Sequence, residues 1–212
     1  MDLLEAILLG ILQGATEFLP ISSSGHLVLI PWWLGWEDPP LTFDVMVHLG
    51  TLVAVLAFFW RDWLTLLRAG WTALKTRSIQ TSSDQELDAR LLLLLVVASV
   101  PAALVGLLLE SVFEEISTPT VVAALLLVTA GLLVYSERHA TSDRTLGSFT
   151  LRDALTVGLA QAFAILPGIS RSGSTIAAGI TRGLPRREAA RFSFLLGTPI
   201  ILAAGGKQAL DL

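Results

Sequence analysis

Long apolar runs alternate with short polar breaks along this chain. Four of the runs have the length of about 20 residues that an α-helix needs to cross a bilayer. They are 41–60, 89–109, 119–136 and 188–206. Pro101 and Pro199 fall inside two of them, where proline is expected to kink or interrupt a helix. The polar stretch 61–88 between the first two runs is expected to be an exposed linker. The pattern predicts an all-α, polytopic membrane protein.

Two other apolar segments are too short to span. Residues 3–19 and 151–166 each run into a break rich in Pro, Gly and Ser, and a second short apolar piece follows. This is the pattern of a re-entrant hairpin, because irregular backbone at membrane depth is tolerated only where protein or a cavity surrounds it. We therefore predict two re-entrant helical hairpins, at 3–35 and 151–184.

The two hairpins are copies of each other. A shift of 148 residues aligns them without a gap. The pairs of identical residues include Leu3 and Leu151, Ala6 and Ala154, Gly10 and Gly158, Gln13 and Gln161, Ile21 and Ile169, Ser22 and Ser170, Ser24 and Ser172, and Gly25 and Gly173. A weaker echo is the tripeptide "LGT", at 49–51 and at 196–198. The alignment indicates an internal repeat.

The number of spans between the hairpins fixes their relative direction. Three spans is an odd number, so the hairpins must enter from opposite faces, which is an inverted-topology repeat with its site near the midplane. We expect one membrane domain, 1–212, with a first repeat at 1–136 and a second at 151–212. The second repeat contains only one span, so we expect the sequence to be a fragment or a short form that lacks about two helices.

Composition and charge support a membrane protein and orient it. The chain is 53% hydrophobic and 15% charged, whereas soluble domains carry about 25% charged residues. Of the 14 basic residues, all but Arg171 and Lys207 fall on one side of the predicted topology, which the positive-inside rule makes cytoplasmic. The first hairpin then opens to the outside. No basic face suggests nucleic acid, and the absence of cysteine excludes disulfides and thiolate metal sites.

The first break, "EFLPISSSGHLVL", carries an unusual set of polar groups for an apolar segment. Gln13 and Glu17 are four residues apart and share a helix face. A carboxylate at membrane depth needs a cation, a partner or a proton, and a structural pair with a buried arginine would satisfy it. Ser22, Ser23 and Ser24 stand where a half-helix begins, so they suit helix capping or an anion site. His26 follows within one turn, as a reactive group or as a core histidine.

The second break, "AILPGISRSGSTIAAG", has a positive charge instead of the acid. Arg171 is the only basic residue predicted at the midplane, and its guanidinium suits bidentate binding of phosphate. Hydroxyl donors and glycines surround it. The hydroxyls belong to Ser170, Ser172, Ser174 and Thr175, and the glycines are Gly168 and Gly173. We expect this set, with Gln13, Ser22, Ser24 and Gly25 of the first break, to bind the substrate.

The differences between the two copies indicate catalysis. Ser23 aligns with Arg171, His26 with Ser174, and Glu17 with Ile165. One half thus supplies an acid, a hydroxyl and an imidazole, and the other half supplies an anchor for an anion. Cleavage of a phosphate ester or anhydride needs such a division. A carrier that flips a polyprenyl phosphate is the alternative, because inverted repeats with broken helices are a transporter architecture.

The motifs "LQGATEFLPISSSGHL" and "LPGISRSGST" resemble the two signatures of the bacterial undecaprenyl-diphosphate phosphatases, integral-membrane enzymes linked to bacitracin resistance. The segments "FDVMVHLGTLVAV" and "EAARFSFLLGTP" are also similar. The resemblance implies hydrolysis of undecaprenyl diphosphate to the monophosphate and phosphate, which recycles the lipid carrier for peptidoglycan synthesis. It further implies a divalent cation, Mg²⁺ or Ca²⁺, and a location in the bacterial inner membrane with the site open to the outer face. A homodimer is compatible with it.

Roles follow for the catalytic candidates Glu17, Ser23, His26 and Arg171. Ser23 is the preferred nucleophile with His26 as base and then acid, and direct attack by His26 is the alternative. Arg171 and the hydroxyls hold the phosphates. Glu17, helped by Gln13, places the metal ion or orients a proton-transfer group. His48 lies outside both signatures, one turn after Asp44, either behind the site or simply packed.

Overall fold

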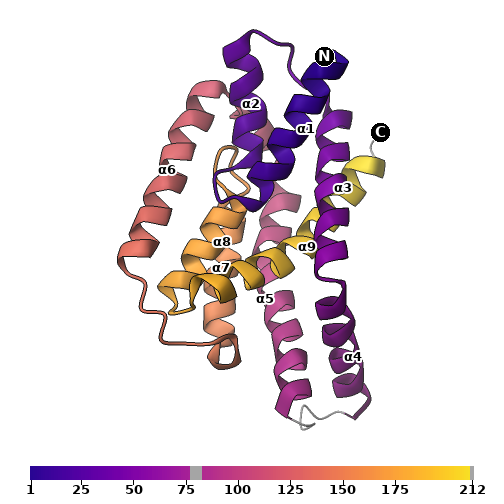
Figure 1. The fold of residues 1–212 in the computed structure, drawn as a ribbon, viewed down its shortest axis with the longest axis vertical. Helices are drawn as coiled ribbons and strands as arrows, with labels where there is room; N and C mark the ends of the chain where they lie inside the picture. The colour runs from indigo at the N-terminus through magenta and orange to yellow at the C-terminus, as the bar shows by residue number, and fades with distance from the viewer. Residues whose placement is uncertain (77–82, 211–212) are drawn as a thin grey trace.

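The computed structural model describes residues 1–76 and 83–210, and within these ranges all regular secondary structure is helical (Figure 1). The helices of the first part of the chain are α1 Leu3–Phe18, α2 Ser23–Leu34, α3 Leu41–Phe58, α4 Trp60–Thr76, α5 Ser83–Glu115 and α6 Pro119–Arg138. The second part contains the 3₁₀ turn η1 Leu146–Ser148 and the helices α7 Leu151–Phe163, α8 Arg171–Thr181 and α9 Arg186–Leu210.

Three of the described helices are long and apolar enough to cross a bilayer. They are α3, the segment Glu86–Leu108 of α5, and α6. At most 28% of each apolar window is buried inside the protein, so most of this apolar surface is free to face lipid. The prediction of an all-α, polytopic membrane protein is confirmed.

The remaining predicted span, 188–206, forms most of α9, which crosses the bundle obliquely (Figure 1). As a membrane span it stays a prediction. Pro101 and Pro199 do not interrupt their helices, because α5 and α9 continue through them. Of the two expected effects of these prolines, a break is therefore wrong, whereas a kink stays a prediction.

The prediction of a linker over 61–88 is wrong for most of its length. Residues 60–76 form α4, α5 already begins at Ser83, and 77–82 lie outside the described residues. Charged residues on the outer face of α4 hide a helical pattern whose inner face is apolar. Leu66 and Ala69 are buried on that face. A Cβ on Gly70 would lie 2.5 Å from Leu92 Cδ2, so glycine lets α4 approach α5 closely.

The two hairpins enter the bundle from opposite ends (Figure 1). The first consists of α1 and α2 with the break 19–22, and the second of α7 and α8 with the break 164–170. Figure 1 shows the tips of both hairpins in the middle of the molecule, where the two irregular segments overlap. Both half-helices α2 and α8 therefore begin deep inside the protein.

The second hairpin lies in the main hydrophobic core. Ala154 and Val157 of α7 are fully buried against α5, and Ile180 of α8 is buried with them. A Cβ on Gly158 would come within 2.5 Å of the backbone oxygen of Ala98. The pair α5 and α7 thus touches backbone to backbone, which only glycine permits at this position.

An ion cluster fixes the entrance to the second hairpin. Asp153, in the first turn of α7, is 1% exposed and accepts hydrogen bonds from Arg144 Nη2 at 2.8 Å and Arg182 Nε at 2.6 Å. Thr150 adds bonds from its amide and its hydroxyl. Burial raises the pKa of Asp153, but these hydrogen bonds outweigh it and hold the pKa well below the usual aspartate range. The clamp ties α7 to α8.

Candidate active site

The first break is shaped by a residue in an unusual backbone conformation. Ser22 has φ +70°, in the left-handed region that non-glycine residues rarely enter. Its hydroxyl accepts the amide of Gly25 at 3.3 Å and caps α2. Capping therefore occupies Ser22, as one serine suffices, and leaves the hydroxyl of Ser23 for another partner.

The second break is held by α6. Gly168 has φ +94°, and a Cβ there would lie 2.6 Å from the carbonyl oxygen of Val122. Thr129 of α6 accepts the amide of Ser170 at 3.0 Å. The hydroxyl of Ser170 caps α8 by accepting the amide of Gly173, also at 3.0 Å. The chain thus enters α8 at a position fixed by another helix.

The two breaks touch through their backbones. A Cβ on Gly25 would lie 3.3 Å from Gly168 Cα, and one on Gly173 would lie 3.0 Å from the carbonyl oxygen of Pro20. Ser172 donates to the carbonyl of Leu19 at 3.4 Å. These predicted substrate-binding glycines therefore serve, in this structure, to bring α2 and α8 together.

An ion pair joins the two breaks. Glu17 Oε1 accepts Arg171 Nη2 at 2.7 Å, although the two residues are 154 positions apart in the chain. The other carboxylate oxygen, Oε2, accepts the hydroxyl of Ser23 at 2.6 Å and lies 3.5 Å from Gln13 Nε2. Glu17 thus joins the Ser23 hydroxyl of its own motif to the Arg171 guanidinium of the other motif. Glu17 therefore has the buried arginine partner of the structural interpretation and also contacts the hydroxyl of Ser23, as the catalytic interpretation requires.

Helix α9 provides the seat of Arg171. Ser193 accepts Arg171 Nη1 through its carbonyl at 3.3 Å, and its hydroxyl lies 2.6 Å from that of Thr175. A Cβ on Gly197 would lie only 1.9 Å from Arg171 Nη1. Sequence reasoning missed both residues, although Gly197 belongs to the "LGT" at 196–198. The repetition of "LGT" in both halves of the chain was the signal that could have identified Gly197.

A small polar cavity of about 110 Å³ opens at this ion pair. Its walls include the predicted residues Glu17, Ser22, Ser23, Ser24, Ser170, Arg171 and Ser172, together with Thr16, His48, Ala164 and Ile169. The remaining predicted residues Gln13, Gly25, His26, Gly168, Gly173, Ser174 and Thr175 do not line it. The cavity is the point where an anion could contact both helix N-termini and the guanidinium.

The two histidines differ in their position relative to the small cavity. His26 points its Nδ1 at the carbonyl of Ser22, 2.6 Å away on its own helix. His48, from α3, lines the cavity instead, and its Nε2 is 3.8 Å from Glu17 Oε2. His48 lies in the segment "FDVMVHLGTLVAV" but in neither signature motif, and α3 reaches the site only through the packing of the bundle.

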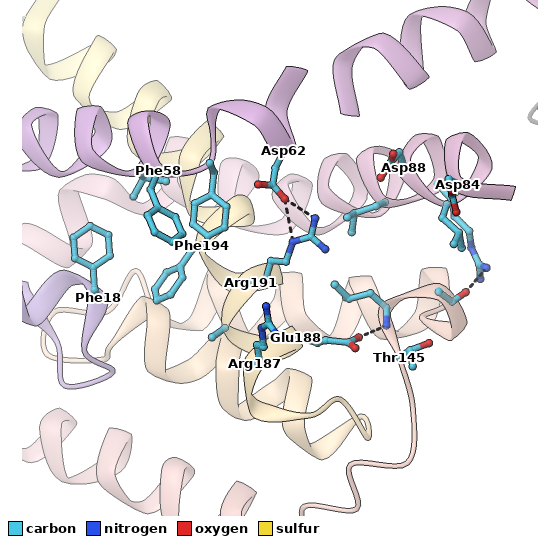
Figure 2. Close-up of a pocket in the computed structure, with 18 of the residues that line it drawn as sticks. Phe18, Phe58, Asp62, Asp84, Asp88, Thr145, Arg187, Glu188, Arg191 and Phe194 are labelled. Carbon is cyan, nitrogen blue, oxygen red and sulfur yellow. Dashed lines mark hydrogen bonds and ion pairs between the residues drawn. The ribbon is translucent and has the colours of Figure 1, made fainter. Parts of the chain in front are cut away.

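A second, larger cavity of about 1340 Å³ lies beside the site (Figure 2). Phe18, Phe58 and Phe194 gather at one end, and Asp84 and Asp88 lie at the other. Between them Arg191 of α9 is paired with Asp62 of α4. The apolar end adjoins the catalytic candidates because Phe18 directly follows Glu17 and Phe194 directly follows Ser193. The reactive groups, however, face the small cavity.

Comparison with known proteins gives a consistent result. The family model described as "Bacitracin resistance protein BacA" matches residues 6–212. A protein named undecaprenyl-diphosphatase from Desulforudis audaxviator is 48% identical over 100% of this chain and 78% of its own length. Relatives with the same name from Pelotomaculum thermopropionicum and Thermomicrobium roseum are each 46% identical, over 97% and 100% of this chain and 74% and 78% of their own lengths.

Proposed function

Because this chain belongs to the bacitracin resistance protein BacA family, we propose that it hydrolyses undecaprenyl diphosphate to undecaprenyl phosphate and phosphate. The reaction regenerates the lipid carrier for peptidoglycan synthesis. One observation carries the proposal beyond the family: Glu17 holds both the Ser23 hydroxyl and the Arg171 guanidinium at the edge of one cavity. The transporter alternative has no comparable support, since the relatives carry the name of an enzyme.

Binding of the diphosphate uses the two half-helices and Arg171. Helices α2 and α8 both begin at the cavity, so their free N–H groups and positive dipole ends suit an anion. Arg171 adds a planar, permanently charged donor. In the free protein it is neutralised by Glu17, and the arriving phosphate competes for the same guanidinium. The polyprenyl tail lies in the bilayer between helices.

Ser23 is the nucleophile of the proposed reaction. Its hydroxyl already donates to Glu17 Oε2 at 2.6 Å, so the carboxylate orients the hydroxyl and is in place to take its proton as the bond to the terminal phosphorus forms. The bond from that phosphorus to the bridging oxygen breaks, and undecaprenyl phosphate leaves. Water then cleaves the phosphoserine, which releases phosphate and restores the Ser23 hydroxyl. Arg171 stabilises the charge that develops on the phosphoryl oxygens. His26 is the alternative acceptor or nucleophile, through Nε2, because its Nδ1 is engaged by Ser22.

The residues present fit a divalent cation, Mg²⁺ or Ca²⁺, beside Glu17. The side-chain oxygen of Gln13 is buried without a hydrogen-bond partner, and the amide nitrogen of the same group lies next to Glu17 Oε2. Gln13 and Glu17 would therefore hold the ion. When bound, the ion supplies charge neutralisation for the diphosphate. Hard cations of this kind keep several positions for water and phosphate oxygens, so two protein ligands suffice.

The test of the proposed function is phosphate release from undecaprenyl diphosphate by the purified protein in detergent, with and without EDTA. Hydrolysis needs no sealed membrane, so turnover here separates an enzyme from a carrier. We expect Ser23→Ala to lower kcat by at least about 10³-fold and His26→Gln to retain more activity. Thr156→Ala, on the exposed face of α7, is the control. Full activity in Ser23→Ala would overturn the role of Ser23.

The orientation is proposed from the charge pattern: a bacterial inner membrane with the small cavity open to the outer face. The chain contains no cysteine, so single cysteines report accessibility without background. Ser24→Cys should react with an impermeant maleimide added outside intact cells, whereas Arg187→Cys, beside the large cavity, should react only after permeabilisation. The reverse pattern would invert the topology. The homodimer stays a prediction, checked by cross-linking of the same variants.

A further inference from the structure

His48 reaches the catalytic centre from α3, a helix that contributes to neither signature motif. Its Nε2 lies 3.8 Å from Glu17 Oε2, and it shares the small cavity with Ser23 and Arg171. The roles proposed above leave this residue without a function.

The hydrogen bond on the other ring nitrogen determines what Nε2 presents. Nδ1 of His48 lies 2.7 Å from the carbonyl oxygen of Asp44. A carbonyl only accepts, so Nδ1 carries the hydrogen, and Nε2 of the neutral ring carries a lone pair. This lone pair faces the carboxylate of Glu17. With the ring neutral, two acceptors therefore face each other, and a cation between them would resolve the repulsion. A backbone carbonyl on Nδ1 is also the usual outer partner of a histidine that binds metal.

The distances suit an ion rather than direct contact. Nitrogen and oxygen ligands lie about 2.1 Å from a small divalent ion, so two ligand atoms on opposite sides of it are at most about 4.2 Å apart. The 3.8 Å between His48 Nε2 and Glu17 Oε2 falls within this limit. Each carboxylate oxygen accepts at two lone pairs, so Oε2 can keep the hydroxyl of Ser23.

A buried oxygen without a partner completes the set. Gln13 is 1% exposed, and its Oε1 accepts no hydrogen bond within the described structure. The same amide group places Nε2 at 3.5 Å from Glu17 Oε2. An uncompensated buried carbonyl costs free energy, and a rotation of the amide would turn this oxygen, instead of Nε2, toward Glu17 Oε2.

We propose that His48 is a ligand, through Nε2, of the divalent cation of the proposed phosphatase, together with Glu17 and Gln13. The described residues contain no cluster of three or more His, Cys, Asp or Glu arranged for a metal, so water and diphosphate oxygens fill the other positions. An imidazole nitrogen favours first-row transition ions over Mg²⁺ and Ca²⁺, which prefer oxygen. A site that includes His48 is therefore expected to accept first-row transition ions such as Mn²⁺. This inference rests on the proposed function.

The test uses Mn²⁺ as a paramagnetic probe on the purified, tag-free chain in detergent. Electron spin-echo spectra report the coupling of an imidazole ¹⁴N bound to the ion, with and without methylenediphosphonate as a non-hydrolysable diphosphate. The chain has three histidines, so His26→Gln, His48→Gln and His139→Gln form a complete matched series. We expect the coupling to vanish in His48→Gln alone, and the Kd for Mn²⁺ in that variant to rise about tenfold or more.

Two results would overturn the inference. One is an absence of ¹⁴N coupling, or of bound Mn²⁺, in the unmodified chain under both conditions. The other is a coupling that survives in His48→Gln. Thermal unfolding of each variant shows that the fold is intact, and His48→Asn provides a second variant if His48→Gln unfolds. Phosphate release is measured separately. Active protein without the coupling rejects only the role of His48, whereas no hydrolysis with any cation rejects the proposed function.

Discussion

The two hairpins share an aligned sequence but pack differently. Each has an exposed outer face: Leu3, Leu4 and Ile11 of α1 are 78%, 64% and 67% exposed, and Leu151, Leu155 and Leu159 of α7 are 53%, 45% and 58% exposed. The inner face of α7, however, packs against α5 in the main hydrophobic core, where Ala154 and Val157 are fully buried. The acid and the serine thus belong to the hairpin that lies outside this core, whereas the arginine belongs to the hairpin that packs within it.

This difference explains how the reactive geometry is held. Arg171 is seated by α9, and its hairpin is clamped by Asp153 and packed on α5. Glu17 forms an ion pair with that guanidinium. Its other carboxylate oxygen accepts the hydrogen bond of Ser23. Under the proposed function, the second hairpin would define the position of the anion, and the first would carry the nucleophile and its acid. Equivalent positions in the two repeats allow this interpretation to be tested pairwise.

The largest difference is expected between Gly197→Ala and Gly50→Ala, the glycines of the two "LGT" tripeptides. A methyl group at Gly197 would lie 1.9 Å from Arg171 Nη1, whereas nothing lies within 4 Å of one at Gly50. Displacing one charged donor costs about 10²- to 10³-fold in kcat. We expect Gly197→Ala to lose activity to that extent and Gly50→Ala to retain it, measured as phosphate release. Equal activities would show that α9 does not seat Arg171.

A smaller effect, on stability, is expected at Gly158 and Gly10. A methyl group at Gly158 would meet the carbonyl of Ala98 at 2.5 Å, but at Gly10 the nearest atom is a methyl of Val47 at 3.9 Å. Overpacking costs about 1–3 kcal/mol, while alanine in an unobstructed helix gains up to about 1 kcal/mol over glycine. Gly158→Ala should therefore lower Tm in detergent, and Gly10→Ala should leave it unchanged or raise it. A lower Tm for Gly10→Ala would contradict the open environment of α1.

The smallest effect is the pH dependence that Asp153 contributes. Its pKa is depressed in the folded chain, so its stabilisation is complete above the ordinary aspartate pKa of about 3.9 and is lost as pH falls toward the folded pKa. Stability should fall by about 1 kcal/mol between pH 5 and pH 3 on this account.

Asp153→Asn removes that slope, since asparagine does not titrate in this range. The variant should be less stable at pH 7, where Arg144 and Arg182 lose their counter-charge, yet its Tm should depend less on pH. Glu5, the aligned residue of the first hairpin, contacts only the chain terminus and its own helix cap, so Glu5→Gln is the control. An unchanged slope in Asp153→Asn would show that other carboxylates dominate acid unfolding.

The local pattern of apolar and polar residues predicts much of the fold. The four long apolar runs appear within helices, and both breaks fall where Pro, Gly and Ser cluster, since those residues end helices and cap the next. The failure at 61–88 has a local cause. Helix α4 alternates Arg, Asp and Thr with Trp and Leu, so its average composition looks polar although one face is apolar.

The sequence by itself also indicated which groups to propose for the site, an acid, a serine and an arginine in two aligned breaks, because such groups at membrane depth are by default functional candidates. The sequence did not determine which of the side chains contact one another. Only the tertiary structure placed His48 in the cavity and His26 outside it, and only it assigned Ser193 and Gly197 to Arg171. These contacts join helices far apart in sequence, and their geometry depends on how closely backbones approach at glycines, which a one-dimensional pattern does not record.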